Sequence, residues 1–526
     1  MRFRSQTIEG YTIFAVSGVN TISFGIDAKD ADKKGLLGFA IERSDPAENE
    51  RYYVFGFKVF PSLVPQPDQN TTVKTYDHPI QSFVWDDFTA KPDRVYEYIF
   101  HPLKGTPKNL DRSAKPISIR VRTEPLFSKL EHDVFFNRGV ASSQAYARKF
   151  HNLRPDKLPP QKQAEALKWL SRDLDTALLK FIANAAKGDT LLCCFYEFRY
   201  DPVAEALREA QRRGVDVTLI VDAKRNANSF PRKDNLELIK DAGFPKKSII
   251  LREAKPSNIQ HNKFMVLLKG KSQTPKEVWT GSTNISDSGI HGQTNVGHWV
   301  RDEAIASKFK EYWELLSADP GPKKNDDRST SQRKNAELRE SVEAICDTPE
   351  KWEDIAAGVT PIFSPRGGPG VLEMYAQMVG EAQGLSCITL AFGISKVFKD
   401  VLSEHTARSH IAFFLLEKED KPNRRSKEPF VALTARNNVY EAWGSYLEEP
   451  LYQWGRETYT KKLKLSQHVS YIHSKFLLMD PLAKNPVVVT GSANFSKAST
   501  NDNDENMLVD SRANVQTCGC PRETGA

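Results

Sequence analysis

Two blocks of this sequence carry histidine, lysine, a Gly-Ser pair and asparagine in the same order. The first block runs from His261-Asn262-Lys263 to Gly281-Ser282-Thr283-Asn284. The second runs from His473-Ser474-Lys475 to Gly491-Ser492-Ala493-Asn494. The two histidines are 212 residues apart and the two Gly-Ser pairs are 210 apart. This agreement in order and spacing indicates an internal duplication.

Each block should present its histidine and lysine on one side of a strand. Both His-x-Lys pairs begin apolar runs, and side chains two residues apart on a strand point the same way. A second apolar run then leads into the Gly-Ser pair, where glycine permits a tight turn. The serine hydroxyl and the asparagine amide beyond it can donate to an oxyanion. We therefore expect Ser282 and Ser492 to contact the substrate.

Together the two copies would offer two imidazoles, two ammonium groups and two amides. This set of groups suits a phosphodiester, because fixed donors can stabilise the charge of a pentavalent, phosphorane-like state. One imidazole can attack phosphorus while the other protonates the leaving oxygen.

The paired motifs resemble those of the phospholipase D superfamily, H-x-K-x4-D-x6-G-S-x-N, over roughly residues 132–510. The resemblance implies two α/β lobes related by a pseudo-twofold axis, with one active site between them. It also implies a covalent phosphohistidine intermediate and neither metal nor other cofactor. By position, the catalytic set would be His261, Lys263 and Asn284 from one half, and His473, Lys475 and Asn494 from the other.

The sequence departs from the family pattern in two ways. The motif aspartate is present as Asp480, but Leu268 takes its place in the first block. The spacers before the Gly-Ser pairs are longer than six residues, twelve after Leu268 and ten after Asp480. We expect different local hydrogen bonding around Leu268, and we interpret both spacers as extended β-hairpin loops.

The segments after the two Gly-Ser-x-Asn motifs differ in charge. The second half has a carboxylate, Glu505, where the first has the neutral Gln293 and Thr294. In the family, a carboxylate here orients the nucleophilic histidine, often across the lobe interface, as in a catalytic triad. The resemblance therefore favours His261 as the nucleophile, served by Glu505, and His473 as the general acid. It leaves Gln293 as a neutral group beside the substrate.

The elements around the motifs suggest three parts. Residues 1–125 contain about seven short apolar runs separated by turns, which predicts an all-β sandwich of immunoglobulin or fibronectin-III type. Its role, docking or structural, stays open. Residues 132–318 show the alternating strand and helix patterns of an α/β lobe, with a strand–helix–strand unit from Asp189 to Asp222.

A second α/β lobe is expected at 336–526, after a polar linker at 319–335. The first lobe ends with a helix-like pattern at 303–316. The second has no equivalent after residue 509, so we expect it to lack its last helix. The overall fold class predicted is thus α/β, with two phospholipase D-like lobes of mixed sheets flanked by helices after a β-sandwich.

Composition bounds the class of protein. The 526 residues include 39% hydrophobic and 27% charged residues with a net charge of +7, which argues against disorder. No apolar run is long enough for a membrane span, and the first residues lack the apolar core of a signal peptide. The six cysteines form no disulfide framework. We expect a cytoplasmic protein, and secretion by a signal-less route stays open.

The function predicted is a metal-independent phosphodiesterase of phospholipase D type, hydrolysing or transferring phosphodiesters. Phospholipid headgroups are the favoured substrates, with peripheral membrane contact and lipid degradation as corollaries. A nuclease with the same chemistry is the alternative, and a phosphate-binding module without activity is a third reading. Since both motifs lie in one chain, a monomer suffices for a complete site, and the oligomeric state stays open.

Overall fold

The computed structural model describes residues 1–511 except 57, 68–70, 140–145, 147–148, 152, 154, 226–229, 350, 404–409, 423–429 and 445–471. The described chain forms two compact units, one built on Met1–Lys129 and the other within Leu130–Val515. The predicted fold class is confirmed, because the first unit is all-β and the second contains two α/β lobes.

The first unit is a sandwich of two antiparallel sheets. Side chains from both sheets share one core, in which the Phe24 and Tyr98 rings lie 4.7 Å apart. One sheet has the order β1 (Arg2–Arg4), β2 (Tyr11–Ser17), β3 (Ile22–Ala28), β8 (Val84–Asp87). The other has the order β10 (Asn109–Asp111), β9 (Val95–Thr106), β4 (Leu36–Asp45), β5 (Glu50–Tyr53), with β11 (Ile117–Arg122) also on β9. A small ribbon pairs β6 (Phe55–Gly56) with β7 (Val73–Lys74).

The first lobe is a seven-stranded mixed sheet with helices on both faces. Its strand order is β12 (His132–Phe136), β18 (Val296–Val300), β17 (Thr274–Gly281), β16 (Lys263–Lys269), β13 (Thr190–Phe195), β14 (Asp216–Asp222), β15 (Ile249–Arg252). The predicted crossover is present, since β13 and β14 are parallel and α4 (Asp201–Arg212) joins them. β13 is buried along its whole length, as its unbroken apolar sequence requires.

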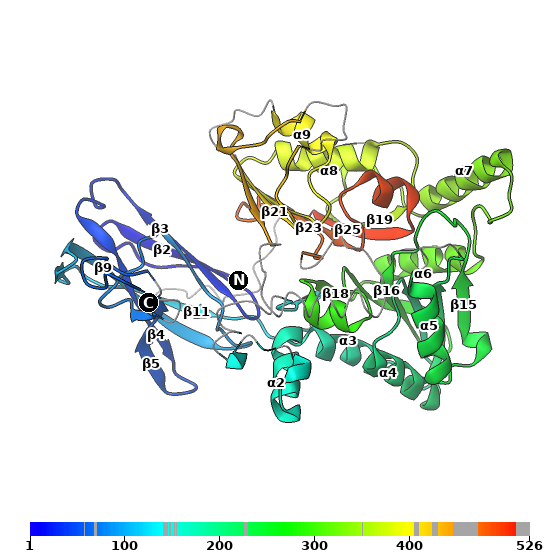
Figure 1. Ribbon diagram of the computed structural model, residues 1–526, viewed down its shortest axis with the longest axis horizontal. Coiled ribbons are helices and arrows are strands. Elements are labelled where there is room, and N and C mark those ends of the chain that lie inside the picture. Colours follow the sequence, from blue (N-terminus) through cyan, green and yellow to red (C-terminus); the bar gives the residue numbers. More distant parts are fainter. Residues whose placement is uncertain are drawn as a thin grey trace. The chain divides into compact units, whose positions relative to one another are not determined.

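Helices cover the two faces of this sheet differently (Figure 1). The helix α6 (Glu303–Ser317) packs on the face that carries Leu192, Phe264 and Val266, together with Phe363 of the second lobe. The opposite face is covered by α3 (Leu174–Ala183), α4 and α5 (Phe230–Asp241). A further helix of this lobe is α2 (Pro160–Ser171), and short turns of helix occupy Pro155–Lys157, Lys246–Ser248 and Ser288–Gly292.

The second lobe repeats the strand order of the first. Its sheet runs β19 (Gly358–Ser364), β25 (Glu505–Ser511), β24 (Val487–Gly491), β23 (Phe476–Met479), β20 (Leu385–Leu390), β21 (Ile411–Leu416), β22 (Val439–Trp443). The helices described in this lobe are α8 (Gly370–Gly380) and α9 (Lys396–Ser403), with short turns at Trp352–Asp354, Ala435–Asn437 and Ala498–Asp502. The two His-x-Lys motifs therefore lie at the starts of equivalent strands, β16 and β23.

The predicted linker at 319–335 is partly helical. The helix α7 (Arg328–Ile345) begins inside it, because the Asp327 side chain accepts a hydrogen bond from Thr330 N at 2.8 Å and caps the first turn. Polar composition concealed this helix, since only its later residues Leu338, Val342 and Ile345 are buried. Residues 319–327 keep the irregular structure that their composition predicts.

The end of the second lobe lies outside the described residues. Described structure stops at Ser511, the last residue of β25, so the expected absence of a terminal helix concerns residues that the structure does not describe. Within the described part of the chain, no helix combines the length and apolar character needed to cross a bilayer.

Candidate active site

The two motif histidines face one another where the lobes meet. Their ring centroids are 6.2 Å apart with an angle of 75° between the rings. Two short parallel bridges between the lobes set this approach, one joining Gln260 to Asp504 and the other joining Thr294 to Ile472. Each histidine follows its bridge, so the segments that carry the histidines are fixed by the opposite lobe.

Glu505 holds His261 across the interface. Nδ1 of His261 lies 3.0 and 2.9 Å from the two carboxylate oxygens of Glu505, and Glu505 is fully buried. When Glu505 is ionised its carboxylate can only accept, so Nδ1 of His261 then carries the proton and Nε2 keeps its lone pair. This tautomer suits a nucleophile.

Asn295 holds His473 in the same way from the first lobe. Its Oδ1 lies 2.8 Å from Nδ1 of His473, while its Nδ2 donates to the carbonyl of Gly289 at 2.8 Å. The second contact fixes the amide orientation, so Oδ1 is the atom that accepts from the ring.

Gln293 and Thr294 are the neutral residues considered from the sequence, and neither of them is the partner of His473 Nδ1. The hydroxyl of Thr294 accepts from the His473 backbone N–H at 3.3 Å, and the carbonyl of Gln293 accepts from Asn137 at 2.7 Å. The position of Asn295 was available in the sequence, because the constant offset of 210 residues between the Gly-Ser pairs carries Glu505 onto Asn295.

The motif serines support these two partners. Ser492 Oγ donates to Glu505 at 2.8 Å, and Ser282 Oγ donates to Asn295 Oδ1 at 2.8 Å. Each hydroxyl also accepts from a backbone N–H of the following strand, Asn506 at 3.0 Å and Val296 at 2.9 Å. Both serines are fully buried, so the geometry favours an orienting role over the substrate contact expected from the sequence.

The motif glycines leave room for those backbone contacts. A Cβ on Gly281 would lie 2.2 Å from the carbonyl oxygen of Val296, and the φ of Gly281 is +132°. A Cβ on Gly491 would lie 2.3 Å from the carbonyl oxygen of Asn506. Any other residue would push the Gly-Ser turn away from the neighbouring strand.

Each motif asparagine has a side-chain oxygen that is not used in a hydrogen bond within the described residues. Among the described residues, Oδ1 of Asn284 and Oδ1 of Asn494 accept no hydrogen bond. Asn284 is 2% exposed, and Asn494 is half-buried. Unpaired buried amides of this kind are costly in a finished core and are common at sites that receive a ligand.

The two lysines are buried and crowded. Lys475 Nζ donates to the carbonyl of its own motif histidine at 2.6 Å, and Lys263 makes the same contact. Burial lowers the pKa of Lys263 to about 7, although the carboxylates of Glu505 and Glu197 oppose that shift. Burial, followed by repulsion from Lys263, holds the pKa of Lys475 well below its ordinary value. A bound phosphate anion would relieve both penalties.

Burial also shifts the pKa values of the two histidines and the glutamate beside the lysines. It lowers the pKa of His261 and of His473 well below the ordinary value, with the two ammonium groups adding to the effect. It raises the pKa of Glu505 to about 8, against the opposing pull of Lys263 and of the hydrogen bond from Ser492. The lowered pKa values of the two histidines favour neutral imidazoles.

Tyr196 contributes to the site and was missed in the sequence. Its ring lies 5.0 Å from the His261 ring, and Lys263 Nζ sits 5.3 Å above its face. The equivalent place after β20 holds Ala391, so only the first half has this ring. Tyr196 ends an apolar strand, and nothing in its sequence context separates it from a core residue.

A buried ionic cluster beside the site was also missed. Asp504, next to Glu505, lies 2.9 Å from Arg252 Nε and 3.0 Å from Lys255 Nζ, and Arg252 is fully buried. These ion pairs join the two lobes next to the His261 segment, whose backbone N–H donates to the Asp504 carbonyl at 2.9 Å. In the first lobe the residue equivalent to Asp504 is Thr294, which carries no charge.

The structure shows what replaces the motif aspartate in the first lobe, where Leu268 stands in its position. Asp480 accepts from the backbone N–H groups of Gln383, Gly384 and Leu385, at 2.8, 2.7 and 3.1 Å, and so fixes the loop before β20. In the first lobe the direction is reversed. Asp189, in the loop before β13, accepts from Gly270 N at 2.8 Å and so fixes the hairpin turn. The same two segments are joined in both lobes, by an aspartate on opposite sides.

Comparisons with known proteins agree with this arrangement. A family described as "Cardiolipin synthase, PLD-like domain" matches residues 178–316 and 418–517, one segment in each lobe. No curated protein matches the sequence significantly.

Several solved structures are similar in fold. Polyphosphate kinase from Porphyromonas gingivalis is 10% identical with a TM-score of 0.40, over 64% of this chain and only 42% of its own length. Phosphatidylserine synthase from Haemophilus influenzae is 14% identical with a TM-score of 0.41, over 64% of this chain and 80% of its own. Yeast tyrosyl-DNA phosphodiesterase is 12% identical with a TM-score of 0.30, over 63% and 84%.

The two H-x-K motifs thus lie at the starts of equivalent strands of two repeated lobes, and the two G-S-x-N motifs lie at the ends of the strands that follow. The family match covers these segments in both lobes and confirms the resemblance to the phospholipase D superfamily.

Proposed function

We propose that this protein is a phosphodiesterase of phospholipase D type that works through a phosphohistidine. The observation that carries the proposal is the pair of imidazoles, whose ring centroids are 6.2 Å apart and whose Nδ1 atoms are both held by the opposite lobe. Each ring therefore presents Nε2 to the space between them. A phosphorus atom placed there would have a nucleophile on one side and a proton donor on the other.

In the first step, Nε2 of His261 attacks phosphorus and a P–N bond forms. His473 enters this step as an imidazolium, a form that the bound phosphate anion stabilises. The P–O bond to one alcohol breaks, and the departing oxygen takes the proton from Nε2 of His473. In the second step, His473 removes a proton from water, whose oxygen attacks phosphorus and breaks the P–N bond. An alcohol in place of water would give transfer instead of hydrolysis.

The roles follow from the partners of the two rings. Glu505 raises the electron density of His261, which favours attack. The neutral amide of Asn295 stabilises an imidazolium less than a carboxylate would, so His473 releases its proton more readily. The ammonium groups of Lys263 and Lys475 and the amides of Asn284 and Asn494 would meet the charge on the non-bridging oxygens. No step in this scheme is assigned to a metal or another cofactor.

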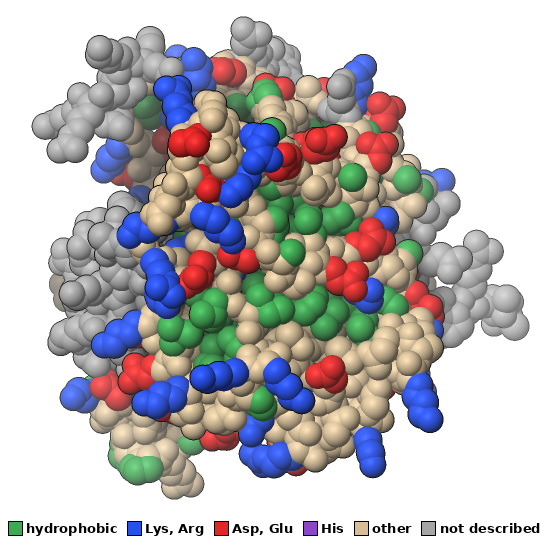
Figure 2. Space-filling view, turned by 90° about the vertical axis from the view of Figure 1, so that its right-hand side faces the viewer, with side chains coloured by type: hydrophobic (Ala, Val, Ile, Leu, Met, Phe, Trp, Pro, Cys, Tyr) green, Lys and Arg blue, Asp and Glu red, His purple; other side chains and the backbone are tan. Residues whose placement is uncertain are grey.

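Phospholipids are the substrate class we favour. The matching family is named for cardiolipin synthase, which supports the lipid reading. A nuclease would be expected to carry a continuous basic groove. On the face shown in Figure 2, the coloured, described side chains place Lys and Arg among Asp and Glu. Nucleic-acid cleavage is the alternative outcome of the test below.

The test is an assay of the wild type and of Lys263→Ala against phosphatidylcholine, single-stranded DNA and RNA, each with and without EDTA. We expect release of the lipid headgroup, lost in Lys263→Ala and unchanged by EDTA. Loss of activity in EDTA would contradict the proposed metal-independent chemistry, and faster cleavage of DNA or RNA would favour the nuclease. Rapid quenching with a phosphorus-labelled substrate should trap label on His261, and label on His473 alone would reverse the assignment.

A further inference from the structure

The two motif lysines have unlike neighbours, although they occupy equivalent places. Lys263 and Lys475 are both 1% exposed, and each donates to the carbonyl of its own motif histidine. Nζ of Lys263 also lies over the face of the Tyr196 ring, 5.3 Å from the ring centre. In the second lobe the residue equivalent to Tyr196 is Ala391, which offers a methyl group in place of a ring.

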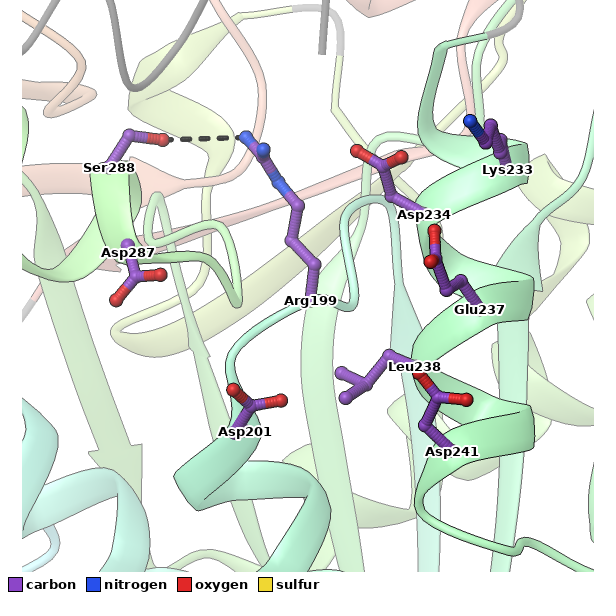
Figure 3. Close-up of a pocket in the computed structure, with 9 residues that line it drawn as sticks. All are labelled: Arg199, Asp201, Lys233, Asp234, Glu237, Leu238, Asp241, Asp287 and Ser288. Carbon is purple, nitrogen blue, oxygen red and sulfur yellow. Dashed lines mark hydrogen bonds between the residues drawn. The ribbon is translucent and has the colours of Figure 1, made fainter. Parts of the chain in front are cut away.

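Hydrogen bonds fix the main chain that carries the Tyr196 ring. The Tyr196 N–H donates to the carbonyl of Asn262 at 2.9 Å, and its carbonyl accepts from Nδ2 of the fully buried Asn235 at 2.9 Å. Further along the same segment, the Arg199 side chain donates to Ser288 Oγ at 3.5 Å, the contact drawn in Figure 3. The segment is thus bonded to the motif on one side and to the loop after β17 on the other.

The Tyr196 ring contacts both ends of the first His-x-Lys motif. Its centroid lies 5.0 Å from that of the His261 ring, with an angle of 63° between the rings, while Lys263 faces its π-surface. The face of an aromatic ring attracts a cation, and the attraction is stronger when both groups are removed from water. Both Tyr196 and Lys263 are buried, so water competes little for the ammonium.

The titratable groups around the lysines also favour a charge on Lys263. Burial lowers the pKa of both lysines. The carboxylates of Glu505 and Glu197 oppose that shift at Lys263, whereas repulsion from Lys263 adds to it at Lys475. The groups that face the two lysines are two carboxylates, one thiol and two imidazoles, namely Glu505, Glu197, Cys194, His261 and His473.

We propose that Tyr196 is a positioning residue that keeps the ammonium of Lys263 charged and beside His261 before the substrate arrives. Lys263 is then the resident cation of the site, and Lys475 is the weaker of the two. The phosphate anion first meets positive charge on the side of His261, which brings phosphorus within reach of the nucleophile. This inference rests on the proposed function for the roles of the two histidines.

The kinetic test compares Tyr196→Leu, which removes the ring, with Tyr196→Phe, which keeps it. The substrate is bis(p-nitrophenyl) phosphate. Since kcat/KM falls as Lys263 loses its proton, its alkaline limb should move about one pH unit lower in Tyr196→Leu. Above that limb kcat/KM should be about tenfold below the wild type, whereas kcat should change less because bound phosphate keeps the ammonium charged. Tyr196→Phe should keep the alkaline limb of the wild type.

The matched control is Phe309→Leu, which removes another buried ring of the first lobe. Phe309 packs against Phe264 and Phe363, at ring distances of 5.2 and 5.0 Å. The control should lower stability and leave the alkaline limb in place. A limb that stays in place in Tyr196→Leu, or that moves equally in Phe309→Leu, would overturn the inference.

A titration without substrate separates this inference from the catalytic proposal. Lysine labelled with carbon-13 at Cε reports the charge of each side chain by NMR. The signals of Lys263 and Lys475 are identified by their loss in Lys263→Met and Lys475→Met. In the wild type Lys263 should lose its proton at a higher pH than Lys475, and this order tests the inference even if Tyr196→Leu fails to fold.

The outcomes of the titration differ for the two proposals. If the ester is not hydrolysed but the lysines titrate in this order, and Tyr196→Leu lowers the pKa of Lys263, the catalytic proposal fails and the role of Tyr196 stands. The reverse order in the wild type would overturn the role of Tyr196, whatever the turnover. A pKa of Lys263 that is the same in Tyr196→Leu and in the wild type would also overturn it.

Discussion

The carboxylate of Glu505 lies 2.9 Å from Nδ1 of His261, although the two residues belong to different lobes. The corresponding contact of His473 is to a neutral amide, Asn295 Oδ1, at 2.8 Å. The repeated lobes thus give their histidines unlike partners, and a difference of one functional group separates the two proposed roles.

Glu505→Gln should slow formation of the phosphoenzyme far more than its breakdown. The amide keeps the shape but withdraws the negative charge that activates His261. We expect kcat to fall by about 10²-fold or more, with KM changed little. Rapid-quench measurement of the labelled intermediate would show the loss.

Asn295→Asp should affect the step in which His473 protonates the leaving alcohol. A carboxylate beside His473 would hold its proton more tightly, so release of the leaving alcohol should slow by about tenfold for a poor leaving group. With nitrophenolate, which needs no proton, the variant should match the wild type. A larger effect of Asn295→Asp than of Glu505→Gln on the nitrophenyl ester would contradict our assignment of the nucleophile.

The pH dependence of kcat/KM should be a narrow bell. Glu505 must be ionised, and its pKa is raised to about 8 by burial, so activity rises as pH approaches that value. Lys263 must be protonated, and burial lowers its pKa to about 7, so activity falls above that value. The maximum should lie between the two values, as a property of the coupled pair. Initial rates on a soluble ester from about pH 5 to about pH 10 test this.

The acidic limb of that bell should disappear in Glu505→Gln, because an amide does not titrate. In kcat the alkaline limb should move to higher pH, since bound phosphate stabilises the ammonium of Lys263. An acidic limb that persists in Glu505→Gln would assign it to another group.

Lys475→Met should stabilise the protein near neutral pH while abolishing activity. Burial and repulsion from Lys263 lower the folded-state pKa of Lys475, so its charge costs stability in full below that pKa. The cost vanishes as pH rises past the ordinary value of 10.5. The gain in Tm at pH 7 should be roughly 2–4 °C for each kcal/mol and should shrink in alkaline buffer.

The control for this measurement is Lys308→Met on the exposed side of α6, where the lysine is 39% exposed. It should leave Tm nearly unchanged at either pH. A lower Tm for Lys475→Met at neutral pH would show that the lysine stabilises the folded protein.

Asp504→Asn should weaken the junction between the lobes. The change leaves the fully buried Arg252 and the neighbouring Lys255 without their shared carboxylate. We expect a loss of about 3–5 kcal/mol in the free energy of unfolding, measured with urea. Glu337→Gln, which breaks the exposed pair with Arg333 on α7, should cost less than about 1 kcal/mol. Equal effects of the two changes would show that the cluster adds nothing to stability.

The fold was largely predictable because its elements repeat. The duplicated H-x-K and G-S-x-N blocks, together with the crossover from Asp189 to Asp222, lead directly to two mixed sheets. The early part of α7 was not predictable, since it is polar on most faces and depends on an N-cap at Asp327. Apolar periodicity is a weak signal for a helix that buries so few residues.

The site was predictable in its motif residues and less so in their surroundings. Spacing identifies the four motifs, but the partner of each histidine lies across an interface, and sequence order does not display such contacts. Asn295 was recoverable from the constant offset between the repeats, whereas Arg252 and Tyr196 have no counterpart in the other half. Residues that act in only one lobe escape any argument from duplication.

Each motif histidine is hydrogen-bonded by a residue of the opposite lobe, and this arrangement affects how the two lobes can change in evolution. A protein with a single lobe could build this site only as a symmetric pair, and both copies would then carry the same residue beside the histidine. Joining two lobes in one polypeptide frees each copy to change separately. Here that freedom is visible as glutamate on one side and asparagine on the other, so the proposed division of roles between nucleophile and acid would be fixed by the sequence instead of being decided at each turnover.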